Sequence, residues 1–197
     1  MPSVLLTAFE PYDRWQTNAS WLALVELTRE LPREPAITTR LYPVDFAEVK
    51  QRLVKDLAAN YDYAIHLGQA PGSSRVQLEA IGINVGGSSH QSPDEYLPLA
   101  DDGPMAYRSP LPLADWAIKL RAAGIPTQVS YHAGTYLCNA TLYWTCYLTE
   151  RLSIKTQAAF LHLPLDVSQV VNEPHGMPAL PTGIAVNALR LILEELQ

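Results

Sequence analysis

Short apolar runs that alternate with longer helical patterns are the feature of this sequence that most constrains its fold. Runs such as SVLLTAF have the length and composition of buried strands. Asn18 or Ser20 is the expected N-cap of the first helix, and Asp45 is that of the second. The pattern predicts strands at residues 3–9, 37–44, 63–69, 76–85, 126–131 and 158–165, and helices at 18–31, 45–60, 113–123 and 181–196, with one more helix between the last two strands. Such alternation indicates an α/β protein, a three-layer α/β/α sandwich with a largely parallel, mixed central sheet.

The length and charge of the chain narrow its class further. Its 197 residues suffice for one sizeable core but not for two, so we expect residues 1–197 to form a single domain. No apolar run reaches about 18 residues, and the opening MPSVLLTAFE lacks the features of a signal peptide. The net charge of −6 comes without a basic cluster. We therefore expect a cytoplasmic protein with neither a membrane nor a nucleic-acid partner.

Residues 86–110 depart from the alternating pattern. This segment is long, rich in turn-forming residues and poorly periodic. Segments of that length in compact domains are usually functional or mobile. The segment could hold a hairpin, which the sequence alone does not place.

The two cysteines, Cys138 and Cys146, fall in the same expected helix. Eight residues of helix separate them by about 12 Å, which is too far for a disulfide. We therefore expect two free thiols in a reducing compartment, and no Cys or His spacing indicates a metal site. Cys138 follows a turn at residues 132–134, near the helix N-terminus, where free N–H groups and the helix dipole favour a thiolate and can receive an oxyanion. The alternative is a small buried apolar residue, which is the role we expect for Cys146.

A nucleophilic cysteine needs a base, and His162 is the best placed of the five histidines. It lies near the carboxyl end of an apolar strand, where open α/β sheets bind their ligands. The alternative is a core histidine bound to a backbone carbonyl. His66 is mid-strand and more typical of a structural role, and the other three lie in turns or loops.

Glu79 is the candidate for the carboxylate that orients the base. It shares strand parity with Ile81 and Ile83, so we expect it on the same buried face, where an ionised carboxylate needs a partner. An imidazolium would be a natural partner. The alternative is a glutamate at the exposed start of a strand, paired with Arg75 on the same side.

Four segments resemble one family in the right order. AGTYLCN (residues 133–139) and FLHLP (160–164) look like the cysteine and histidine signatures of pyrrolidone carboxyl peptidases, also called pyroglutamyl peptidase I. GQAPGSSRVQLEAIGIN (68–84) resembles the glutamate segment, and LLTAFEPYDRWQTNAS (5–20) resembles the opening strand and pocket loop. Four ordered motifs are far more specific than any one of them.

The resemblance implies a cysteine peptidase that removes N-terminal pyroglutamate from peptides through a thioester acyl-enzyme. It implies Cys138 as nucleophile, His162 as base and then acid, and Glu79 as the orienting carboxylate. It also implies that the enzyme needs no cofactor and forms a homotetramer.

The resemblance further implies a pocket for the lactam ring. Phe9 and Tyr12 would form its walls, Gln69 and its backbone neighbours would hydrogen-bond the lactam, and Asn18 would support the site. Pyroglutamate is a neutral ring with two apolar faces, so aromatic walls and a few fixed polar groups suit it. The alternative for Phe9 and Tyr12 is ordinary core packing.

The sequence also departs from the family pattern. Ser89 stands where the family usually carries an arginine close to the catalytic site, and Tyr12 replaces a phenylalanine. An oxyanion would then depend on the Cys138 backbone N–H, with Arg75 or Arg108 as a second donor. A second function class therefore stays open, a divergent relative that acts on another amide or binds a small lactam-like ligand without turnover.

Overall fold

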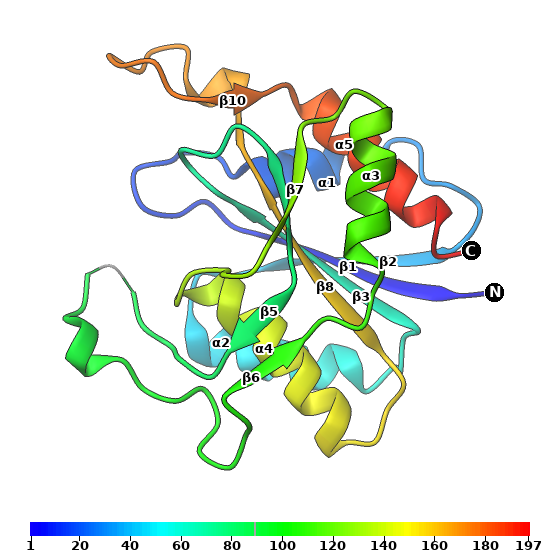
Figure 1. The fold of residues 1–197 in the computed structure, drawn as a ribbon, viewed down its shortest axis with the longest axis vertical. Helices are drawn as coiled ribbons and strands as arrows, with labels where there is room; N and C mark the ends of the chain where they lie inside the picture. Colours follow the sequence, from blue (N-terminus) through cyan, green and yellow to red (C-terminus); the bar gives the residue numbers. More distant parts are fainter. Residues whose placement is uncertain (89) are drawn as a thin grey trace.

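The computed structural model describes residues 1–88 and 90–197. Its centre is a six-stranded sheet in the order β2-β1-β3-β8-β4-β7 (Figure 1). β2, β1, β3 and β8 pair in parallel, β4 runs antiparallel to β8, and β7 runs parallel to β4. The strands are β1 (Ser3–Phe9), β2 (Ala36–Tyr42), β3 (Tyr63–Gln69), β4 (Val76–Glu79), β7 (Thr127–Ser130) and β8 (Gln157–Leu163). The prediction of a largely parallel, mixed sheet is therefore confirmed.

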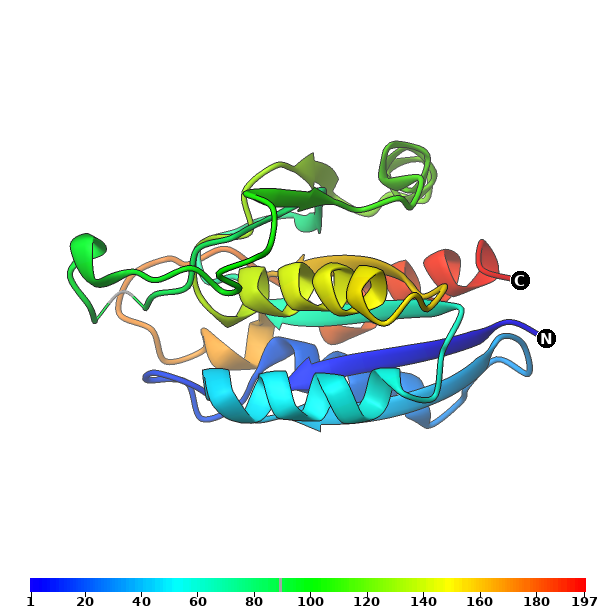
Figure 2. The ribbon, with the colours of Figure 1, turned by 90° about the horizontal axis from the view of Figure 1, so that it is seen from below.

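In the described part of the chain, five α-helices cover the two faces of this sheet. They are α1 (Ala19–Thr28), α2 (Phe46–Leu57), α3 (Leu113–Ala122), α4 (Leu137–Arg151) and α5 (Thr182–Glu194). One buried apolar cluster joins the sheet, through residues such as Leu67, to α1, α3 and α5. A second joins the opposite face, through residues such as Phe160, to α2 and α4, which pack side by side (Figure 2). The predicted three layers are present.

The prediction of one continuous strand at residues 76–85 is wrong, because the chain leaves the main sheet at Ala80 and forms two strands. Only β4 belongs to that sheet, whereas β5 (Ile81–Ile83) pairs with β6 (Ala106–Arg108) in a separate antiparallel ribbon. Ala80 is held at the junction, where its N–H donates to Ser130 O and its carbonyl accepts from Ser109 N–H. β6 is thus a strand inside the long segment 86–110, which also contains a short 3₁₀ turn, η1 (Pro93–Glu95).

The remaining boundaries shift by a few residues. Asp45 is the N-cap of α2, as predicted, and of the two candidates for α1 the cap is Asn18, whereas Ser20 lies within the helix. α1 already ends at Thr28. After β8 the chain forms a second small parallel ribbon and a 3₁₀ turn before α5, made of β9 (Leu165–Asp166), η2 (Val167–Gln169) and β10 (Ala179–Leu180). No helix within the described ranges is long and apolar enough to cross a bilayer.

His66 ties three elements together inside the second cluster. It is fully buried in β3, and its Nδ1 lies 2.8 Å from Thr7 Oγ1 in β1. Its Nε2 lies 2.9 Å from Thr145 Oγ1 in α4. The Thr145 hydroxyl donates to Thr141 O, so Thr145 accepts from His66 Nε2–H, and Nδ1 accepts from Thr7. The predicted structural role for His66 agrees with this neutral, doubly bonded ring.

Acid should destabilise the protein through His66. Burial lowers the pKa of His66 to about 3, whereas in the unfolded chain it is about 6.5. The stability that the neutral ring contributes is present above pH 6.5 and is lost as pH falls, by about 2 kcal/mol between pH 7 and 5. His66→Gln keeps an N–H donor for Thr145 but cannot titrate, so urea unfolding at the two pH values should show a smaller loss in this variant. The exposed His175, changed to Gln, is the matched control. An equal loss in His66→Gln and wild type would contradict this account.

Candidate active site

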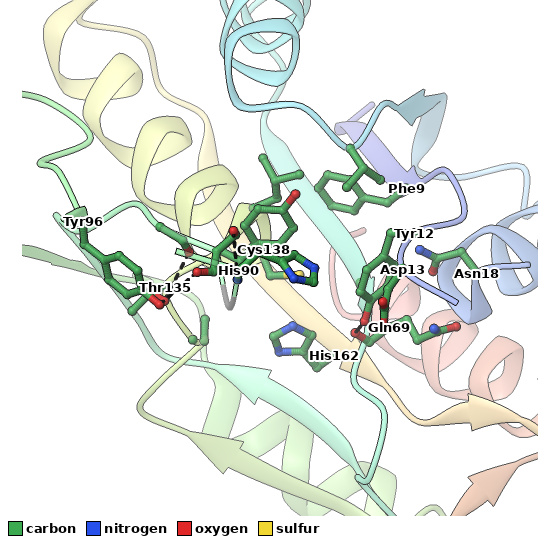
Figure 3. Close-up of a pocket in the computed structure, with 18 residues that line it drawn as sticks. Phe9, Tyr12, Asp13, Asn18, Gln69, His90, Tyr96, Thr135, Cys138 and His162 are labelled. Carbon is green, nitrogen blue, oxygen red and sulfur yellow. Dashed lines mark hydrogen bonds between the residues drawn. The ribbon is translucent and has the colours of Figure 1, made fainter. Parts of the chain in front are cut away.

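One pocket of about 400 Å³ gathers most of the predicted site residues. It lies where the carboxyl ends of β1, β3 and β8 meet the start of α4, and Cys138 and His162 both line it (Figure 3). The pocket thus lies at the carboxyl ends of parallel strands, which is where the sequence led us to expect a site.

Cys138 is the second residue of α4. The first residue whose N–H bonds within the helix is Ala140, which donates to Tyr136 O, so the N–H groups of Leu137, Cys138 and Asn139 precede the helical ladder. These donors and the positive end of the helix dipole surround the thiol with partial positive charge. A thiolate, or the oxyanion of an adduct formed at Cys138, would be stabilised here.

Asn139 anchors this helix start, and sequence reasoning did not single it out. It is fully buried, its Nδ2 donates to the carbonyls of Ile83 and Val85, and its Oδ1 accepts from Ile83 N–H at 2.8 Å. All three bonds go to β5 or the residues just after it. The thiol is thus carried by a helix end that is fixed to a neighbouring strand.

His162 and Glu79 meet across the antiparallel pair of β8 and β4. Gln77 is the register partner of His162, which places Glu79 diagonally opposite the ring. Glu79 is fully buried, and its Oε1 lies 2.7 Å from His162 Nδ1. His162 is therefore not a core histidine bound to a backbone carbonyl, because its Nδ1 binds a carboxylate. Glu79 is not an exposed residue paired with Arg75, because it is buried and paired with His162.

The electrostatics of His162 follow from this arrangement. Burial alone would lower the pKa of His162, but the charge and hydrogen bonding of Cys138, and then those of Glu79, outweigh burial and raise it. Because an ionised carboxylate can only accept, Nδ1 carries the proton that Glu79 binds. Nε2 is then the nitrogen available to Cys138, as a base requires.

Phe9 and Tyr12 line the same pocket, so the structure brings the two predicted walls to the thiol. Phe9 ends β1 and is almost fully buried. Burial, followed by the influence of Cys138, raises the pKa of Tyr12 to about 12, and its hydroxyl donates to Gln69 O at 3.4 Å. The Tyr12 hydroxyl therefore adds a hydrogen-bonding group to an otherwise largely apolar pocket.

Gln69 and Asn18 hold the walls in place. The side chain of Gln69 turns towards α1, where its Oε1 accepts from Ala19 N–H at 2.7 Å and from Gln169 Nε2. Asn18 Oδ1 accepts from Ser20 N–H, and its Nδ2 donates to Glu10 O. These bonds leave the backbone of Gln69, and not its side-chain oxygen, as the group that Tyr12 contacts.

The structure does not bring Arg75 or Arg108 to the thiol. Arg75 is exposed before β4 and forms no ion pair with any residue that the structure describes. Arg108, in β6, lines a different cavity together with Cys146 and Glu150. The prediction that one of them supplies an oxyanion donor is therefore wrong. Neither the expected strand face of Arg75 nor the long segment that carries Arg108 fixes where the side chain lies. The predicted replacement of the family's arginine by Ser89 concerns a residue outside the described ranges. Burial raises the pKa of Cys146 to about 12, in agreement with its predicted passive role.

Gly68 is a site residue that sequence reasoning missed. A Cβ atom at this position would lie 2.8 Å from Cys138 Sγ and 2.7 Å from Cζ of Phe160, closer than real contacts allow. The Phe160 ring is itself packed between the rings of His66 and His162. Only a residue without a side chain leaves room for the thiol here. A glycine at the end of an apolar strand was the available signal.

Gly68→Ala should therefore displace the thiol. We expect alkylation of Cys138 by iodoacetamide at neutral pH, followed by peptide mass spectrometry, to slow by about a hundredfold, because small misplacements at reacting centres have effects of that size. Gly183→Ala is the matched control, since a Cβ there meets nothing within 4 Å. Unchanged alkylation in Gly68→Ala would show that the thiol does not depend on this space.

Comparison with known proteins extends the resemblance to the whole chain. A family model described as pyroglutamyl peptidase matches residues 2–197. The pyrrolidone-carboxylate peptidase of Clavibacter michiganensis subsp. michiganensis is 37% identical over 179 residues, which cover 87% of this chain and 82% of that protein. The pyrrolidone-carboxylate peptidase of Thermococcus kodakarensis is 32% identical over 201 residues, which cover 98% of this chain and 97% of that protein.

Solved structures agree with these matches. The pyrrolidone carboxyl peptidase from Fervidobacterium islandicum AW-1 superimposes with a TM-score of 0.94 at 32% identity, covering 100% of this chain and 98% of that one. The enzyme from Thermococcus litoralis gives a TM-score of 0.90 at 28% identity, covering 100% and 93%. The sequence matches and the structural matches thus give the same family, and the chain belongs to the pyroglutamyl peptidase family of cysteine-type omega peptidases.

Proposed function

We propose that this protein removes N-terminal pyroglutamate from peptides by a Cys138–His162–Glu79 triad and a thioester acyl-enzyme. The single observation that carries the proposal is the meeting, in one pocket, of a thiol at a helix N-terminus with a histidine held 2.7 Å from a buried carboxylate. Nucleophile, base and orienting group are the parts that covalent amide hydrolysis needs.

In the first half-reaction, His162 Nε2 takes the Cys138 proton as Sγ attacks the pyroglutamyl carbonyl. The tetrahedral oxyanion is received by N–H groups at the start of α4, including that of Cys138. When the amide C–N bond breaks, His162 returns the proton to the leaving amine, and the acyl group stays on Sγ as a thioester.

In the second half-reaction, water attacks the thioester carbonyl while His162 accepts its proton. The C–S bond breaks, free pyroglutamate leaves, and the proton restores the Cys138–His162 pair. Glu79 stays ionised throughout and stabilises the imidazolium each time it forms. Arg75 and Arg108 have no part in these steps, because neither lines the pocket.

The walls of the pocket suit a neutral lactam. Phe9, Tyr12 and Tyr136 supply aromatic surface, and the backbone of Gln69 supplies polar groups at the end of β3. A ring with one N–H and one C=O needs such walls and few charges. A second candidate function is that of a relative that prefers another amide. The observation that favours it is the hydrogen bond from the Tyr12 hydroxyl to Gln69 O, because a lactam N–H could otherwise donate to this carbonyl.

The setting of the enzyme is also part of the proposal. Both cysteines are free, which suits a reducing cytoplasm. The cytoplasmic location, the homotetramer that the resemblance implies and the single independent domain over residues 1–197 stay predictions.

Replacing the nucleophile tests the proposal. Cys138→Ala and Cys138→Ser should abolish release of the chromophore from a chromogenic pyroglutamyl amide, because neither side chain offers a thiolate. Cys146→Ser is the matched control and should keep turnover with some loss of stability, since Cys146 is partly buried and packs against the core.

Thiol blocking adds a second control. Iodoacetamide should inactivate wild type and Cys146→Ser alike. Substantial turnover by Cys138→Ala would contradict the mechanism, and absence of turnover by the wild-type protein would favour the second candidate.

A further inference from the structure

We propose that the part of the pocket beneath Tyr96 is a subsite for the residue that follows pyroglutamate, and that Tyr96 makes it prefer aromatic side chains there. This inference rests on the proposed function. It concerns a residue in the irregular segment between β5 and β6, to which the sequence patterns assigned no role.

The pocket extends to both sides of the reacting groups. Figure 3 shows Phe9, Tyr12 and Gln69 on one side of Cys138 and His162, and Tyr96 and Thr135 on the other. Its volume of about 400 Å³ is in the range that holds a drug-sized ligand, so a single five-membered ring leaves much of it free. With the lactam on the side of Phe9, a chain leaving the scissile carbonyl must continue towards Tyr96.

Neighbouring residues hold Tyr96 in place on this side of the pocket, which we call the Tyr96 arm. Its ring lies flat against Gly87, where an added Cβ would come within 2.1 Å of Cδ1, and its hydroxyl donates to Ser88 O at 3.1 Å. Gly87 N–H in turn donates to Thr135 O at 2.9 Å, three residues before Cys138. These contacts hold the Tyr96 ring in a fixed position relative to the helix that carries Cys138, although Tyr96 itself lies in an irregular segment.

The chemistry of this arm suits an aromatic side chain. Tyr96 is half-buried and lines the pocket together with the small residues Gly87, Ala133 and Gly134 and with a second ring, that of His90. Stacked or edge-to-face aromatic pairs are favourable beyond the apolar area that they bury. A substrate with a small second residue such as alanine would place its scissile carbonyl at the thiol equally well, but its side chain would make no aromatic contact with Tyr96.

The test compares kcat/KM for two dipeptide amides, pyroglutamyl-phenylalanine amide and pyroglutamyl-alanine amide. Wild type should prefer the phenylalanine substrate, and Tyr96→Ala should lower the ratio of the two values about tenfold, because only the phenylalanine substrate gains from the ring. Tyr96→Phe keeps the ring and should keep the preference. Leu97→Ala is the matched control, because Leu97 is the next residue, is 69% exposed and does not line the pocket.

The outcomes separate the subsite from the proposed function. Turnover of both substrates with an equal ratio in wild type and Tyr96→Ala overturns the subsite alone, as does a wild type without the preference. Absence of turnover of either substrate by wild type overturns the proposed function and the subsite with it. Because the test compares a ratio within one variant, any measurable turnover of the alanine substrate by Tyr96→Ala suffices to show that the variant is folded.

Discussion

The hydrogen bond between Glu79 and His162 is the interaction on which the site depends. An ionised carboxylate that is fully buried is strongly destabilising unless it is paired, and His162 is its partner at 2.7 Å. The bond exists because β4 runs antiparallel to β8 and so sets Glu79 diagonally across from the ring. By fixing the proton on Nδ1, it leaves Nε2 available to the thiol, as the proposed role of His162 as a base requires.

Space for the thiol is the second constraint, and it comes from packing and not from charge. Gly68 leaves the room that Cys138 Sγ occupies, and Phe160 closes that space from the side of His66 and His162. Asn139 fixes the start of α4 to the strand ribbon through three hydrogen bonds. Cys138 and His162 are thus positioned by regular elements, while the walls of the pocket come from the ends of strands such as β1 and from the loops that follow them.

Much of the fold could be predicted because the pattern of apolar residues reports directly on regular elements. β1 and β3 have the predicted bounds, and the caps Asn18 and Asp45 were visible as residue types. The break at Ala80 was not, since both halves of the predicted strand are apolar and only tertiary pairing separates them. Glu79 is buried as expected, but the reason given for it was wrong, because Ile81 and Ile83 lie in another sheet. Gly68 acts through a distant contact that local pattern does not encode, and the arginines were misplaced for the same reason.

Trapping the acyl-enzyme tests the central claim most directly. The protein is mixed with a pyroglutamyl thioester or activated ester, quenched in acid within the first turnover, digested and examined by mass spectrometry. The account predicts an added pyroglutamoyl group on the peptide that contains Cys138, and its absence from Cys138→Ala. A pyroglutamoyl group on another residue, or turnover of the same substrate without any trapped acyl group on Cys138 when hydrolysis is slowed, would contradict it.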